Sequence, residues 1–230
     1  MVRQIGSMSG ALNRDLPDTG PIELDSHADT CCAGSNCVVL EYSSKSCNVI
    51  GFNRDNPSDQ LLNVPIVKAV TAYDAPSGQT FIIVIPQALY LGYLFTYSLL
   101  CPNQLHQYGI IVDDIPRHFA PDPSKATHSI YIPNNDVCIP LQMHGVISLF
   151  YTRRPTIPEI EDCLWLVLTS KLDWDPHSSD FQELENIEHD THYQHVPCAE
   201  RNILKLFCAR AISHPYATIC FFSFRLIREQ

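Results

Sequence analysis

Apolar and polar side chains alternate in short runs along the first half of the chain, and turn residues separate the runs. This pattern predicts β-strands at residues 22–24, 38–40, 64–73, 79–85 and 88–91. Asp-Ala-Pro-Ser-Gly at residues 74–78 has the composition of a hairpin turn. A single short helix is expected between Pro102, which suits a first helical turn, and Gly109, which suits a C-terminal cap.

The pattern continues with less regularity in the second half. Further strands are predicted at residues 129–132, 137–143, 145–151 and 164–168, and Thr156 is placed to cap a short helical turn. Residues 1–21 read as a flexible leader, in which Asp18-Thr19-Gly20, between Pro17 and Pro21, predicts a turn. The fold class expected is therefore all-β with one short helix and a poorly defined C-terminal extension.

Composition limits the possible functions. With 230 residues and 45% apolar side chains the chain can bury a real core. A net charge of −10 argues against nucleic-acid or anionic-membrane binding, and no run of about 20 apolar residues is present. The N-terminus lacks a signal-peptide core, so we expect an intracellular, cytoplasmic location and reduced thiols for the ten cysteines.

The most informative stretch is Leu24-Asp25-Ser26-His27-Ala28-Asp29, which ends the first predicted strand. It resembles the active-site motif of retropepsins, the aspartic proteases of retroviruses and retrotransposons, in which an apolar residue precedes Asp-Ser/Thr-Gly-Ala. His27 stands where the family has Gly. Residues 97–110 resemble the Leu-Leu-x-x-x-x-Leu element of copia-like retrotransposon proteases, without the Gly-Arg-Asn that many retroviral members carry before the helix.

The resemblance implies a closed retropepsin-like barrel at residues 22–115, followed by a β-rich extension at 116–177 and an acidic linker with an apolar tail at 178–230. It also implies an aspartic endopeptidase that cleaves a retrotransposon polyprotein as a homodimer and needs no cofactor. Each subunit would supply one catalytic Asp25, because two carboxyl groups must share a proton to activate water. The other implied site residues are Ser26 bracing the dyad, His27, Ala28 and Asp29 in the turn and on the substrate backbone, and Gly51 and Phe52 in a flap.

Other interpretations stay open. A degenerate retroelement remnant would keep the fold and only bind or support a partner. Asp25-Ser26-His27 also contains the Asp-x-His that opens metal-dependent phosphoesterase sites. Val112-Asp113-Asp114 resembles the metal-binding hairpin of reverse transcriptases, but a polymerase needs a far longer chain. Two groups of residues have the side-chain types of zinc ligands. The first is Cys31, Cys32, Cys37 and Cys47, which buried thiols explain better. The second is His189, His192, His195 and Cys198, which a solvated polar linker explains better.

Overall fold

A computed structural model describes residues 19–50, 60–193 and 225–227 of the chain. The described residues are mostly β-strand with a few short helices, which confirms the prediction of an all-β protein. They fall into two compact units, one with residues 19–174 and 225–227 and the other with residues 175–193. The expected flap residues Gly51 and Phe52 lie outside the described residues.

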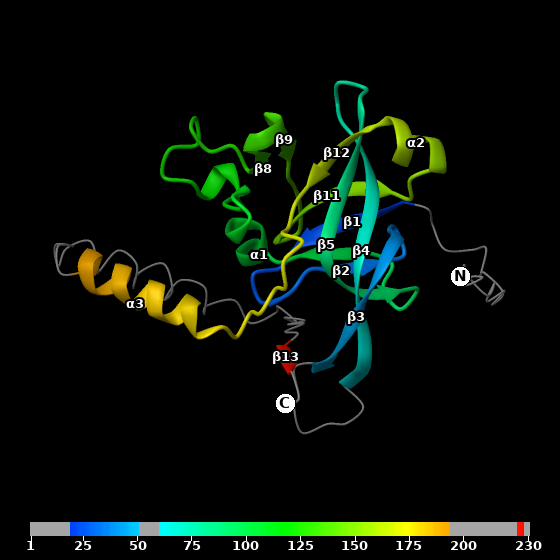
Figure 1. Ribbon diagram of the computed structural model, residues 1–230. Helices are drawn as coiled ribbons and strands as arrows, with labels where there is room; N and C mark the ends of the chain where they lie inside the picture. The colour runs from blue at the N-terminus through cyan, green and yellow to red at the C-terminus, as the bar shows by residue number, and fades with distance from the viewer. Residues whose placement is uncertain (1–18, 51–59, 194–224, 228–230) are drawn as a thin grey trace. The chain divides into compact units, whose positions relative to one another are not determined.

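The first unit carries the strands and two α-helices (Figure 1). Its strands are β1 Thr19–Leu24, β2 Cys32–Gly34, β3 Val38–Ile50, β4 Gln60–Asp74, β5 Thr80–Gly92, β6 Ser98–Leu100, β7 Ile111–Asp113, β8 Ser129–Ile132, β9 Val137–Pro140, β10 Gln142–His144, β11 Ile147–Arg153, β12 Leu164–Val167 and β13 Arg225–Ile227. Its α-helices are α1 Pro102–Gln107 and α2 Ile157–Asp162, and it also has the 3₁₀ helices Arg117–Phe119 and Pro133–Asn135. The second unit contains α3, Ser179–Tyr193, at a position where we expected a linker.

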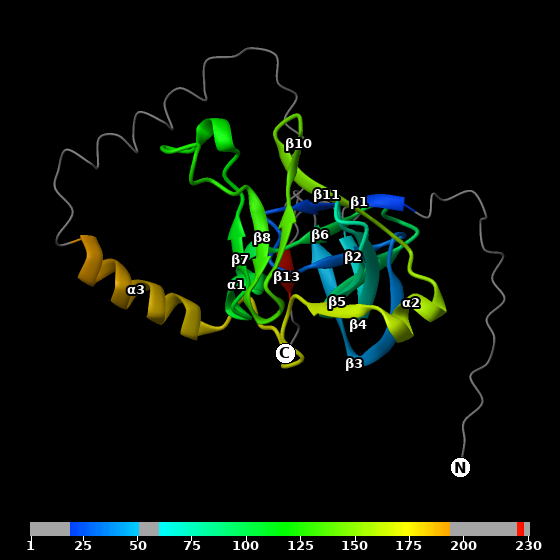
Figure 2. The ribbon, with the colours of Figure 1, turned by 90° about the horizontal axis from the view of Figure 1, so that it is seen from above.

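Among the described residues, ten strands form one sheet with the order β10-β11-β1-β6-β2-β5-β4-β3-β13, and β12 adds to β5. β1 runs parallel to β6 and antiparallel to β11, and β11 also pairs with β4 through Arg153 and Ala72. A separate sheet has the order β7-β8-β9. Strands on both sides of residue 115 therefore share the large sheet, since β10, β11 and β12 follow that position (Figure 2).

The long hairpin of β4 and β5 is built as predicted. Ala75 N–H donates to Gln79 O at 2.9 Å, and Gly78 takes a φ of +85°, which glycine adopts without steric cost. The prediction for α1 is also confirmed, with Pro102 in the first turn and Gly109 at a φ of +82° after the helix. Thr156 caps α2 in a capping box with Glu159.

The strands of the large sheet pack apolar side chains on both faces. On one face Ile22, Ala33, Val67, Ala88 and Leu100 belong to the main core. On the other face a second cluster contains Cys32, Leu89 and Leu99 together with side chains from β3 and β4. Ile22 and Leu24 point toward the main core, so the alternation of a strand turns Glu23 and Asp25 toward the second cluster.

Two local predictions were wrong. Thr19, Gly20 and Pro21 were expected in a flexible leader and a proline-bounded turn, but they form the first half of β1. Their partners are residues 151–153 of β11, 130 or more positions away. Pro21 is tolerated there although proline lacks an N–H. A long-range pairing of this kind leaves no local signal in the sequence.

Asp113, at the end of β7, has a structural role. Asp113 Oδ2 accepts hydrogen bonds from the backbone N–H and the hydroxyl of Thr127, both at 2.8 Å, and from His128 N–H at 3.1 Å. Burial raises the pKa of Asp113, but these hydrogen bonds outweigh that effect and lower it.

No helix in the described part of the chain is long and apolar enough to cross a membrane.

Candidate active site

Asp25 lies in a tight turn directly after β1. Its N–H donates to Leu100 O at 3.1 Å, which extends the parallel pairing of β1 and β6 by one residue. Ala28 N–H closes the turn on Asp25 O at 3.2 Å, and His27 N–H donates to Asp25 Oδ1 at 2.8 Å. The backbone therefore fixes both the position of Asp25 and one oxygen of its carboxylate.

The side chains of this turn divide between core and surface. Ala28 is 3% exposed, Asp25 and Asp29 are half-buried, and Ser26 and His27 are exposed. His27 does not need the backbone freedom of the Gly that the motif has at this position. Positive φ among the described non-glycine residues occurs at Asn63, His128 and Asp136, and His27 is not one of them. The turn thus accommodates His27 by directing its ring outward.

A buried polar network holds the strands beneath the turn. Ser98 Oγ, on β6, accepts from Gly34 N–H of β2 at 2.9 Å and donates to Asn36 Oδ1 at 2.6 Å. Asn36 Nδ2 donates to Thr152 Oγ1 of β11 at 2.8 Å. Ser98 and Asn36 are both fully buried. Satisfied buried groups of this kind stabilise one register, so the network fixes β2, β6 and β11 relative to one another.

Gln104 of α1 supports the strand that leaves the turn. Its Oε1 accepts from Cys31 N–H at 2.8 Å, and its Nε2 donates to Gln87 O of β5 at 2.9 Å. Gln104 is 2% exposed. From the sequence, only the missing Arg of the Gly-Arg-Asn motif was evident. In the structure Gln104, two residues after the first residue of α1, ties this helix to the turn.

Trp174 holds the other end of the turn. Its indole N–H donates to Asp29 O at 2.7 Å across 145 residues of chain, and the side chain is 9% exposed. Sequence reasoning missed this contact as well, since Trp174 lies far beyond the segment that carries the motif. The geometry of the turn therefore depends on Trp174, the residue of the first unit after which the second unit begins.

Glu23 is a second carboxylate next to Asp25 that sequence reasoning also missed. Burial raises the pKa of Glu23, the charge of Asp25 raises it further, and His144 lowers it. Burial likewise raises the pKa of Tyr97, with Glu23 and Asp25 adding to the effect. Period-two alternation was the available signal, because it places Glu23 and Asp25, the residue directly after β1, on one side of the chain and Ile22 and Leu24 on the other.

Buried thiols surround the turn. Burial raises the pKa of Cys31 and of Cys32, and Asp29 and Asp25 add to the effect on Cys32. Cys31 Sγ accepts from Cys101 N–H at 3.3 Å. The seven cysteines in the described residues are thiols that form no disulfide, and Cys31, Cys32, Cys37 and Cys47 are buried, as the interpretation of packed thiols predicted.

No group of three or more His, Cys, Asp or Glu side chains among the described residues has an arrangement that could hold a metal ion. His189 and His192 lie in α3, while His195 and Cys198 lie outside the described residues. Asp25 and His27 contact each other through the backbone N–H of His27.

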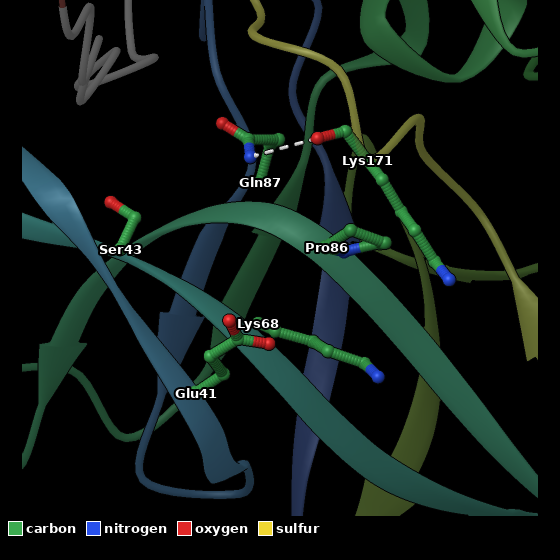
Figure 3. Close-up of a pocket in the computed structure, with 6 residues that line it drawn as sticks. All are labelled: Glu41, Ser43, Lys68, Pro86, Gln87 and Lys171. Carbon is green, nitrogen blue, oxygen red and sulfur yellow. Dashed lines mark hydrogen bonds between the residues drawn. The ribbon is translucent and has the colours of Figure 1, made fainter.

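A pocket of about 250 Å³ opens elsewhere on the first unit (Figure 3). It is lined by Glu41, Ser43, Lys68, Pro86, Gln87 and Lys171. Gln87 Nε2 donates to Lys171 O at 3.5 Å across it, and Lys68 Nζ lies 4.8 Å from the Trp165 ring centroid. None of the lining residues belongs to the turn at residues 25–29.

Comparisons of the chain with protein-family models, with curated proteins and with solved structures found no match.

Proposed function

We propose that the protein is an aspartic endopeptidase whose catalytic dyad is formed by Asp25 from two copies of the chain. The observation that carries this proposal is the geometry of Asp25, a half-buried carboxylate held by its own turn, with Ser26 and His27 exposed beside it. A carboxylate fixed at an accessible turn can face its symmetry-related copy across a two-fold axis.

The proposed chemistry needs both carboxyl groups. One ionised Asp25 takes a proton from water, while the protonated Asp25 of the second copy donates a hydrogen bond to the scissile carbonyl oxygen. Water adds to the carbonyl carbon, and the amine leaves after it receives a proton. Ser26 braces the dyad, Ala28 packs beneath the turn, and the substrate backbone binds near Asp29. The substrate class is a polypeptide, as the resemblance to retrotransposon proteases implies.

Sheet pairing supports the closed-barrel part of the proposal. β11 pairs with β1 on one side and with β4 on the other, and β1, β6, β2, β5 and β4 follow in order between these contacts. Such a path returns to its starting strand, as the strands of a closed barrel do. The catalytic turn would then lie where β1 leaves this barrel.

A second candidate is a binding remnant without turnover. The exposed imidazole of His27, next to Asp25, favours it, because a ring at the dimer axis takes space that Gly would leave free. In this case the fold and the peptide-binding surface are kept, and the two Asp25 carboxyl groups do not come within hydrogen-bonding distance.

The test is peptide cleavage by the full chain at mildly acid pH, with Asp25→Asn as the matched variant and a chelator as control. An Asp dyad predicts cleavage that survives the chelator and is lost in Asp25→Asn, with the variant still folded. A folded dimer that cuts nothing would support the remnant. Peptide cleavage abolished by the chelator would contradict the Asp dyad, and chelator-sensitive cleavage of a phosphate ester would support the metal-dependent phosphoesterase.

A further inference from the structure

Glu23 is placed to act together with Asp25. The two residues are separated by one position, and in an extended strand such residues point to the same side. Leu24 between them and Ile22 before them contact the main core on the opposite side. Glu23 therefore lies on the face of the sheet from which a substrate would reach Asp25.

The surroundings of Glu23 are apolar on both sides. Its in-register neighbours are Leu149 on β11 and Leu99 on β6, which are 2% and 3% exposed. The same row continues through Cys32 on β2, which pairs with Leu99, to Leu89 on β5. The Glu23 carboxylate thus stands within a row of apolar side chains, close to Asp25.

The charge of Glu23 is only partly compensated. In the described part of the chain no Lys, Arg or His nitrogen lies within 4 Å of its carboxylate, and His144 acts on it only at longer range. Asp25 repels it, and the charges of both carboxylates also raise the pKa of Tyr97, which is partly buried. A half-buried anion beside an aromatic ring is a favourable place for a cation brought by a ligand.

We infer that Glu23 determines the specificity of this site by binding a Lys or Arg side chain of the polypeptide next to the bond that Asp25 attacks. The inference rests on the proposed function. The aliphatic stem of such a side chain packs along Tyr97, which is partly exposed, while its charged end reaches Glu23. A purely apolar neighbour would instead leave the carboxylate desolvated and unpaired, which disfavours it.

Cleavage of matched peptides measures this preference. The peptides differ only in the residue before or after the scissile bond, which is Lys, norleucine or Glu, so that Lys and norleucine share a stem and differ in charge. We expect kcat/KM for Lys to exceed that for norleucine by about ten- to a hundredfold, the size of effect typical of a desolvated charge pair. Glu23→Gln brings the ratio close to one, and Glu23→Lys favours the Glu peptide.

Glu161→Gln is the matched control, because Glu161 is an exposed carboxylate on α2 and takes no part in the site. It should keep the wild-type ratio. Wild-type cleavage with no preference for Lys, or a preference unchanged in Glu23→Gln, would overturn the role of Glu23 while leaving the proposed protease intact.

Binding separates the two proposals. The Asp25→Asn chain, which cannot form the dyad, is titrated with the Lys and norleucine peptides by calorimetry, with and without Glu23→Gln. Tighter binding of the Lys peptide that Glu23→Gln removes supports the inference even if the wild type cleaves nothing, in which case only the protease proposal fails. Equal binding of the two peptides, unchanged by Glu23→Gln, contradicts it.

Discussion

Trp174 donates its indole N–H to Asp29 O at 2.7 Å, although the two residues are 145 positions apart. Asp29 ends the turn that begins with Asp25, so the proposed catalytic turn is held from the far end of the first unit. A segment that stopped near residue 115 would lack this contact, and would also lack β11, which pairs with β1. We therefore expect the turn to keep its geometry only in a chain that includes Trp174.

Replacing Trp174 tests this dependence. Trp174→Phe removes the indole donor and leaves Asp29 O without it, which should lower the free energy of unfolding by about 1–3 kcal/mol. The chain has two Trp residues, so Trp165→Phe leaves Trp174 as the sole indole fluorophore. Its emission should change when a peptide binds at the turn. An unfolding free energy in Trp174→Phe equal to that of the wild type would show that the hydrogen bond contributes nothing.

Gln104 should be equally important on the other side of the turn. Gln104→Leu leaves Cys31 N–H and Gln87 O without their side-chain partner, and we expect a loss of about 2–4 kcal/mol in unfolding free energy. Gln104→Glu keeps the acceptor for Cys31 N–H and should retain slow hydrogen exchange at that amide. Gln107→Leu, on the exposed side of α1, is the control and should change stability by less than about 0.5 kcal/mol. Rapid exchange at Cys31 in the wild type would contradict the assignment.

His27 gives a prediction about dimerisation. Its ring is exposed and its φ is not positive, so His27→Gly removes bulk at the proposed two-fold axis without relieving backbone strain in the monomer. We expect a tighter dimer in sedimentation equilibrium and higher activity, together with a loss of about 0.5–1 kcal/mol in stability because Gly adds freedom to the unfolded chain. An unchanged or weaker dimer would mean that the ring does not face the partner copy.

Arg153 and Glu159 predict a dependence of stability on pH. Hydrogen bonds from the Arg153 guanidinium and from the backbone and hydroxyl of Thr156 hold the pKa of Glu159 at about 2, below its ordinary 4.5. Because the folded pKa is depressed, this stabilisation is complete above about pH 4.5 and is lost as the pH falls toward 2. Urea unfolding should show a steeper loss over this range in the wild type than in Glu159→Gln. Glu161→Gln should follow the wild type, and parallel curves for all three would refute the assignment.

Much of the local structure could be predicted from the sequence, because it depends on neighbouring residues. The hairpin at residues 74–78, α1 between Pro102 and Gly109, and the Thr156 cap all follow from short-range turn and capping chemistry. The pairing of Thr19–Pro21 with β11 and the contact of Trp174 with Asp29 connect residues 130 or more positions apart. Patterns of periodicity and composition carry no information about such partners.

The candidate site shows the same division. The position of Asp25 after an apolar strand was visible in the sequence, and so was the alternation that places Glu23 on its face. The polar support from Gln104 and the outward ring of His27 were not, because they depend on how α1 and β6 pack against the turn. A motif identifies the candidate residue, while its supporting contacts come from tertiary structure.

The most direct test of the central claim is a mixing experiment with wild-type and Asp25→Asn chains at constant total concentration. If each active site takes one Asp25 from each of two copies, an equal mixture should retain about one quarter of the wild-type activity, because only about a quarter of the dimers contain two intact chains. If each chain acted alone, about half of the activity would remain. A value near one quarter would establish the shared dyad, and a value near one half would contradict it.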